Sequence, residues 1–205
     1  MPSLVRPDGC RLHYELAGDP GSQALVLLEG IGGDIAGWRR NIPTLATALR
    51  VAIEHRGNGR GDERTPLRSV LRGMVAQEAA LTHADRVRTL VLAGTHPGPA
   101  HAIAVADRTV PKGEPWRALY APGFPELHPD AVADDLRAMA AQPDHPHGQR
   151  REWEAMQAWD DFDRLPRTTV PTLVLHGTED QVVAPGNAEL LARRIPDFID
   201  RHRDA

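Results

Sequence analysis

The distribution of apolar and polar residues predicts several short strands separated by turns and helices. Residues 3–16 are predicted to form a β-hairpin, because two strand-like segments flank a Pro-Asp-Gly turn and Asp-Gly is a strong hairpin signal. The continuous apolar run at 24–28 is typical of a strand that is buried on both faces in a parallel sheet. Further strands are predicted at 50–55, 87–93 and 173–175.

Apolar residues spaced three and four apart predict amphipathic helices between these strands. One is predicted at 38–49, where Trp38, Ile42, Leu45 and Leu49 share a face. Three more are predicted at 130–141, 148–159 and 187–195.

A single helix is also predicted from about Pro66 to about Thr82. Thr65 can cap its start, and proline is favoured at the first helical position. Gly73 does not exclude this helix, because a glycine inside a helix lowers its stability by only about 1 kcal/mol relative to alanine. Apolar residues recur on one face throughout, namely Leu67, Val70, Leu71, Met74, Val75 and Leu81.

The bulk composition narrows the class of protein. A chain of 205 residues with 41% apolar and 25% charged residues is ordinary for a globular protein of one domain, or of one domain with an inserted lid. The net charge of −4 gives no electrostatic reason to expect nucleic acid or an anionic membrane as a partner. A lone cysteine, Cys10, excludes an intramolecular disulfide, and no apolar run approaches membrane-spanning length, so a cytoplasmic location is expected.

The front half of the chain resembles the α/β-hydrolase family. The resemblance is carried by Val-Leu-Leu-Glu-Gly-Ile-Gly-Gly at 26–33, by Trp38, and by Arg-Gly-Asn-Gly-Arg-Gly-Asp at 56–62. Glu29 stands where the family commonly has His, and Gly61 stands where it commonly has Ser.

Two later blocks and one helix extend this resemblance in the order that the family has. The blocks are Asp-Arg-Val-Arg-Thr-Leu-Val-Leu-Ala-Gly at 85–94 and Val-Pro-Thr-Leu-Val-Leu-His-Gly-Thr-Glu-Asp-Gln-Val-Val at 170–183. Gly-Met-Val-Ala-Gln-Glu at 73–78 is similar to the helix that follows the family's catalytic serine. The resemblance implies an α/β fold, with a mostly parallel sheet flanked by helices. Its expected parts are an N-terminal part of the core at 1–96, a helical lid at 97–169 and a C-terminal part of the core at 170–205.

A serine hydrolase of this family needs a nucleophile on a tight turn, a histidine base, an orienting acid and two N–H donors for the oxyanion. The resemblance implies that Asp180 is the triad acid, since it follows the strand at 173–175; a turn or capping aspartate is the alternative. It also implies that the N–H of Ile31 is one oxyanion donor. His176 at the strand end is interpreted as structural rather than as the base.

The nucleophile elbow is where the sequence departs from the family. Alignment on residues 73–78 puts Val70 at the serine position, with Arg68 and Arg72 in place of the small flanking residues. Ser69 is one residue away and is the only one of the three serines in a plausible position. The chain has no aspartate or cysteine at that turn to take its place.

The spacing of the predicted elements indicates that two catalytic segments are missing. Only the 31 residues 56–86 separate two predicted strands, which is enough for one crossover helix and its loops, whereas the family has two helices and the nucleophile strand there. After 187–195 the family's catalytic-histidine loop is also missing. The sheet is therefore expected to have fewer strands than the family's eight. The candidate bases are His83, His96 and His202.

Three further features of the sequence bear on ligand binding. Trp153 and Met156 lie on one stripe of the predicted helix at 148–159 and either line a substrate pocket or pack the lid onto the sheet. Asp-His-Pro-His at 144–147 lacks the i, i+4 histidine spacing of a helical zinc motif, so no metal is expected. The glycine-rich loops match no nucleotide-binding pattern, and no cofactor is expected.

These observations favour a hydrolase relative that is catalytically impaired in this chain. The first alternative is an active carboxylic-ester-type hydrolase with a rearranged triad of Ser69, Asp180 and a histidine from elsewhere. The second is a non-enzymatic protein that binds a partner through the lid. A small ester-like molecule is the expected substrate or ligand. Loss of a central strand would expose sheet edges, so self-association into a homo-oligomer is also expected.

Overall fold

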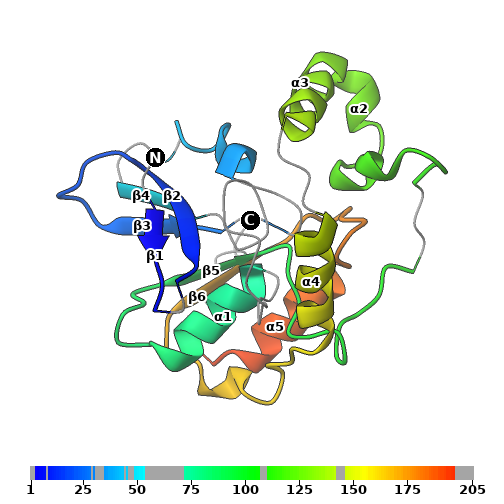
Figure 1. Cartoon of the computed structure of the whole chain (residues 1–205). Helices are drawn as coiled ribbons and strands as arrows, with labels where there is room; N and C mark the ends of the chain where they lie inside the picture. The colour runs from blue at the N-terminus through cyan, green and yellow to red at the C-terminus, as the bar shows by residue number, and fades with distance from the viewer. Residues whose placement is uncertain are drawn as a thin grey trace, which may run out of the picture. The chain divides into compact units, whose positions relative to one another are not determined.

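The computed structural model describes residues 3–7, 9–28, 30, 35–43, 45, 49–53, 72–106, 110–141 and 146–196. The chain divides into two compact units, whose helices and strands are labelled in Figure 1. The first comprises Met1–Arg72 and Ala133–Met156, and the second comprises Gly73–Val132 and Gln157–Ala205. Residues of the predicted lid, 97–169, belong partly to the first unit and partly to the second. The division into 1–96, 97–169 and 170–205 stays a prediction.

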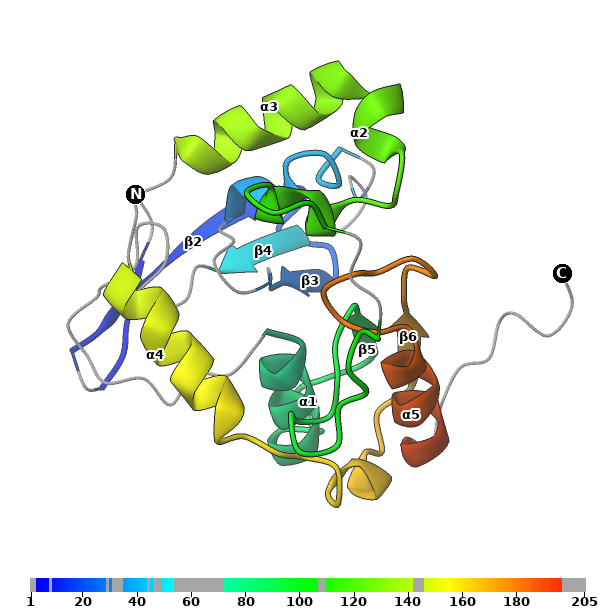
Figure 2. The same ribbon diagram turned by 90° about the vertical axis from the view of Figure 1, so that its right-hand side faces the viewer.

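The first unit contains a four-stranded sheet in the order β1-β2-β4-β3. β1 pairs with β2 and β2 with β4 in antiparallel fashion, whereas β3 and β4 are parallel and lie side by side (Figure 2). The predicted hairpin is confirmed: Gly9 adopts a φ of 80° in the turn, and its N–H donates to the carbonyl of Arg6. The strands are β1 (Ser3–Val5), β2 (Arg11–Ala17), β3 (Ala24–Leu27) and β4 (Leu49–Ile53).

The predicted helix at 38–49 is wrong. A short 3-10 helix, η1 (Ile35–Trp38), is followed by turns, and Leu49 already belongs to β4. The reason is Pro43, which has no N–H to donate to the carbonyl of residue 39 and clashes with it in a regular helix. The small core of this unit gathers around Leu27 and Ala52.

Two helices of the Pro-rich stretch lie mainly in the first unit. They are α3 (Pro129–Ala140) and α4 (Pro146–Gln157), which confirms the helices predicted at 130–141 and 148–159 to within two residues. Ion pairs from Arg39 to Asp134 and Asp135 hold α3 to the turn that follows η1.

The second unit contains a parallel pair of strands, β5 (Leu90–Ala93) and β6 (Thr172–Leu175). Helices α1 (Arg72–Thr82) and α5 (Gly186–Arg194) pack on this pair through the larger core, which includes Ala80, Leu92 and Leu191. The predicted helix at 66–82 is confirmed from Arg72 onward, and its first part lies outside the described residues. Three short helices also lie in the described part of this unit: η2 (Pro115–Leu119), α2 (Phe124–Leu127) and η3 (Leu165–Arg167).

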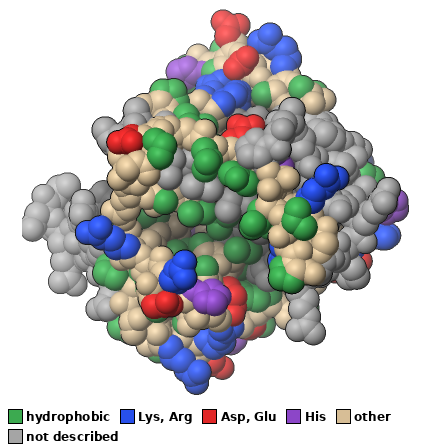
Figure 3. Space-filling model, turned by 60° about the vertical axis from the view of Figure 1, so that its left-hand side comes forward, with side chains coloured by type: hydrophobic (Ala, Val, Ile, Leu, Met, Phe, Trp, Pro, Cys, Tyr) green, Lys and Arg blue, Asp and Glu red, His purple; other side chains and the backbone are tan. Residues whose placement is uncertain are grey.

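The strands of the described residues thus form two sheets, and the break between them falls between β4 and β5 in the sequence. β3 is a terminal strand of the first sheet, and β5 has β6 as its one strand neighbour. The prediction that 24–28 is buried on both faces is wrong, because Val26 is 52% exposed. Val91 in β5 is 51% exposed. Hydrophobic side chains are also visible among charged ones on the surface drawn in Figure 3.

No helix in the described ranges is both long enough and apolar enough to cross a bilayer.

Candidate functional site

The carboxyl ends of β5 and β6 bring Asp180 and Gly94 together. Because the two strands are parallel, the loops that follow them emerge at the same edge. Gly94 has a φ of 53°, and a Cβ atom built on it would lie 3.5 Å from Oδ2 of Asp180. Ligands of open α/β sheets bind at the carboxyl ends of strands, so this edge is the candidate functional site.

The carboxylate of Asp180 is fixed within its own loop. Its Oδ1 accepts the N–H groups of Val182 at 2.8 Å and Val183 at 2.9 Å. These two bonds close a tight turn directly after β6 and engage Oδ1, so Oδ2 is the oxygen that can accept from a further donor. An orienting acid uses such an oxygen to accept an N–H from the base.

The imidazole paired with this acid is His176. Its Nε2 lies 3.4 Å from Oδ2 of Asp180 and 2.9 Å from the carbonyl oxygen of Val183. Both partners are acceptors, so Nε2 carries the proton when the ring is neutral. The side chain is 5% exposed, and Nδ1 is buried with no partner among the described residues. A triad base must turn its second nitrogen toward the nucleophile, and within the described ranges no serine, threonine or other donor is hydrogen-bonded to Nδ1 of His176.

The first turn of α1 packs against the segment that follows β5. A Cβ atom on Gly73 would lie 2.5 Å from Cβ of Thr95 and 2.8 Å from its Cγ2. The side chain of Gln77 donates to the carbonyls of Gly73 and His96, both at 3.2 Å. The hydroxyl of Thr95 is buried and has no partner in the described part of the chain. The helix that resembles the family's post-serine helix is thus held at the edge where Asp180 lies.

Two of the three candidate bases can be located, and neither has the geometry of a base for Asp180. His83 follows the far end of α1, about 15 Å along the helix axis from Gly73 at 1.5 Å per residue. His96 is 8% exposed, and burial lowers its pKa, so the ring is neutral. Its Nδ1 accepts the N–H of Gly98 at 3.2 Å, which leaves the proton on Nε2.

Several predicted site residues lie outside the described residues, namely Ser69, Ile31 and His202. Trp153 and Met156 on α4 are described: Trp153 is 55% exposed, whereas Met156 is 4% exposed. Their assignment to substrate binding stays a prediction. Of the Asp-His-Pro-His segment, His147 is described and exposed. The described ranges contain no group of three or more His, Cys, Asp or Glu side chains arranged to hold a metal ion.

A charged network fixes α1 from its outer side. Nη1 of Arg164 lies 2.7 Å from Oε2 of Glu78 on α1 and 2.7 Å from Oδ1 of Asp161. Asp161 is fully buried, and this burial raises its pKa to about 6. The bond from Arg164 lowers the pKa of Glu78. These groups join α1 to the segment before β6 and therefore have a structural role.

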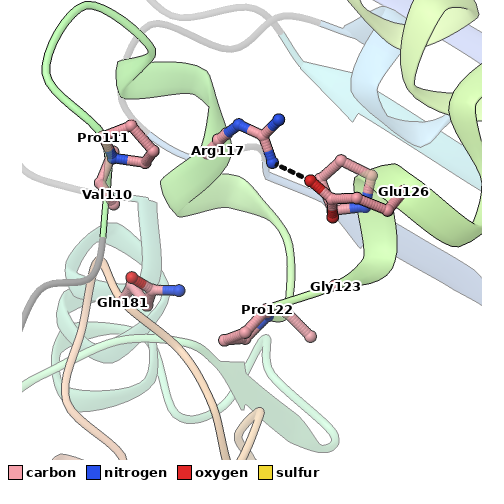
Figure 4. A pocket seen from close by; sticks show the side chains of 9 residues that line it. Val110, Pro111, Arg117, Pro122, Gly123, Glu126 and Gln181 are labelled. Atoms are coloured by element: carbon pink, nitrogen blue, oxygen red, sulfur yellow. Dashed lines mark hydrogen bonds and ion pairs between the residues drawn. The ribbon is translucent and has the colours of Figure 1, made fainter.

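A cleft of about 370 Å³ lies beside the acid loop, within the second unit (Figure 4). Gln181, the residue after Asp180, forms one side of it. Arg117 and Glu126 form another, and the rest of the lining is mainly apolar. Sequence reasoning missed both this cleft and the pairing of His176 with Asp180. The i, i+4 spacing of the latter two residues was the one available signal.

Comparison with known proteins gives the class of protein. No family model matches the sequence. The structure superposes on a hydrolase from Pseudomonas aeruginosa PA01 with a TM-score of 0.76 and 25% identity, over 96% of this chain and 87% of that one. It superposes on the enol-lactonase from Burkholderia xenovorans LB400 with a TM-score of 0.78 and 22% identity, over 96% and 89%. The chain has the α/β-hydrolase fold, as the three sequence blocks predicted, and its structural neighbours are α/β-hydrolases.

Among curated relatives are proteins named RutD carbamate hydrolase. The protein from Stutzerimonas stutzeri (strain A1501) is 26% identical over 227 residues, covering 91% of this chain and 85% of the relative. That from Variovorax paradoxus (strain S110) is 27% identical over 225 residues, with the same coverage. Since 91% of 205 residues is about 187, about 40 residues of the first relative's aligned stretch have no counterpart here.

Proposed function

We propose that this chain is a catalytically impaired α/β-hydrolase that keeps the acid of the triad but lacks a working nucleophile and base. The proposal rests on the pairing of Asp180 with a buried imidazole. Its one imidazole partner among the described residues is His176, whose second nitrogen is buried and without a partner. An acid paired in this way cannot orient a base toward a substrate.

The arrangement of the strands supports the same proposal. The two sheets of the described residues part between β4 and β5, which is the sequence interval where the family's nucleophile strand is expected. The curated relative from Stutzerimonas stutzeri has about 40 more residues than this chain over the aligned stretch, enough for a strand, a helix and a loop. We infer that the nucleophile strand with its elbow, and the histidine loop, account for these residues.

An active hydrolase that uses Ser69 is the second candidate. It is favoured by the geometry of Asp180, whose Oδ1 is locked by two N–H donors while Oδ2 faces the edge at Gly94. By analogy with the relatives' names, its substrates would be carbamates or small carboxylic esters. A non-enzymatic binding protein is the third candidate, favoured by the cleft beside Gln181.

Hydrolysis of p-nitrophenyl acetate and of a p-nitrophenyl carbamate by wild type, Ser69→Ala and Ser22→Ala separates these candidates. Ser22 lies in the loop before β3 and is the matched control. The proposal predicts the same low rate for all three proteins, set by exposed imidazoles. A wild-type rate that Ser69→Ala abolishes and Ser22→Ala leaves intact would establish the second candidate instead.

A further inference from the structure

The cleft beside the acid loop has the dimensions of a site for a small ring compound. Its volume of about 370 Å³ is near the lower end of the roughly 300–1,000 Å³ that ligand pockets span. All of its lining residues belong to the second unit. Because its volume is small, the cleft does not accommodate a long acyl chain and suits a ligand with one ring and one polar group.

The walls of the cleft are apolar and stiff. Pro111, Pro122 and Pro125 contribute to them, together with Val110 and Ala121. Proline has a fixed φ, so these walls lose little conformational entropy when a ligand binds. Such walls can bind a flat apolar group with little loss of conformational entropy in the protein.

The charged end of the cleft disfavours anions. Nε of Arg117 donates to Glu114 at 2.6 Å, and Nη1 donates to Glu126 at 2.6 Å (Figure 4 shows the second bond). Two carboxylates share one guanidinium, so the group carries a net charge of −1. A carboxylate ligand would find the arginine already neutralised and would be repelled by the excess negative charge.

The other end of the cleft offers an amide. The side chain of Gln181 is directed toward the cleft in Figure 4, and the residue is 9% exposed. Its position is set by the neighbouring turn, in which Asp180 accepts the N–H groups of Val182 and Val183. A primary amide has two N–H donors and an acceptor oxygen with two lone pairs, so a bond to the protein leaves capacity for a ligand.

We propose that this cleft binds a small uncharged carboxamide or urea, with its apolar body between the prolines and its amide group paired with the amide of Gln181. An amide ligand can also donate an N–H to the second oxygen of Glu126, which a carboxylate ligand cannot do. The proposal concerns binding alone. It stands whether or not the chain hydrolyses esters, so its failure and that of the proposed function are distinguishable.

Three ligands with the same ring and different charge test the proposal: benzamide, benzoate and benzylamine, titrated into the full chain by NMR. Benzamide is expected to bind in the millimolar range, and benzoate at least tenfold more weakly. Gln181→Leu is expected to weaken benzamide at least fivefold. Glu126→Gln removes one negative charge and is expected to narrow the gap between benzamide and benzoate. Glu189→Gln, an exposed carboxylate on α5 outside the cleft, is the control and should change nothing.

Any of four results would overturn the proposal. They are no binding of benzamide, benzoate binding as tightly as benzamide, benzylamine binding more tightly than benzamide, and unchanged benzamide binding by Gln181→Leu. If Gln181→Leu fails to fold, Glu126→Gln decides the matter, because Glu126 has a 58% exposed side chain and its loss leaves the core intact. An unchanged ratio of benzamide to benzoate affinity in that variant then contradicts the proposal.

Discussion

Replacement of Gly73 by alanine should destabilise the protein, although alanine is the better helix former. The gain in helix propensity is about 1 kcal/mol. Against it, the new Cβ would lie 2.5 Å from Cβ of Thr95 and 2.8 Å from its Cγ2, both well inside van der Waals contact. Overpacking a well-packed site costs about 1–3 kcal/mol, and this overlap belongs at the upper end. The expected net loss is about 2 kcal/mol in the free energy of unfolding, measured by urea denaturation.

The Thr95 side chain cannot escape this overlap by rotating. It is 4% exposed, and its own Cβ, which does not move with χ1, is one of the clashing atoms. Thr95→Ala should therefore fail to rescue Gly73→Ala, whereas Thr95→Gly should rescue it with a coupling energy of about 1 kcal/mol or more. Ala79→Gly on the same helix calibrates the propensity term. A Gly73→Ala variant that is as stable as wild type, or more stable, would refute the close packing of α1 against Thr95.

Two further changes test the electrostatics and the buried hydrogen bonds. Burial raises the pKa of Asp161 to about 6 in the folded protein, whereas its value in the unfolded chain is about 3.8. The contribution of Asp161 to stability is therefore fully present below the unfolded pKa and is lost as the pH rises to about 6, which changes the free energy of unfolding by up to about 3 kcal/mol. Urea unfolding between pH 4.5 and 7.5 should show that Asp161→Asn lacks this component; identical pH profiles would contradict the assignment. Asn187 is 1% exposed; its side chain accepts the N–H of Ile103 at 2.9 Å and donates to the carbonyl of Ile103 at 2.8 Å. Asn187→Ala should cost about 2–3 kcal/mol and speed amide exchange at Ile103, and a loss below 1 kcal/mol would show that the loop is held by other contacts.

Local patterns were sufficient wherever one short-range rule determined the structure. The Pro-Asp-Gly turn predicted the hairpin, and period-3.6 spacing predicted α3, α4 and α5 to within two residues. The helix predicted at 38–49 does not form, because Pro43 interrupts the apolar stripe and its missing N–H ends a regular helix. The exposure of Val26 was not predictable from its apolar neighbours, since it depends on which strands pair in space.

The candidate site was predictable in part. The sequence block around β6 predicted the position of Asp180 after a strand end, which is where the structure has it. The pairing of His176 with Asp180 depends on how the loop closes through the N–H groups of Val182 and Val183. The cleft depends on residues 110–126 lying beside Gln181, and nothing local in either segment encodes that proximity.

The proposed impairment implies that the chain has no activated serine. The most direct test is labelling with a fluorophosphonate, which forms a covalent adduct with the serine of a working triad, followed by mass spectrometry of the intact chain and its peptides. Because the chain has three serines, at 3, 22 and 69, any adduct is assigned without ambiguity. No adduct is expected under conditions that label an active serine hydrolase to completion. A stoichiometric adduct on Ser69 would contradict it.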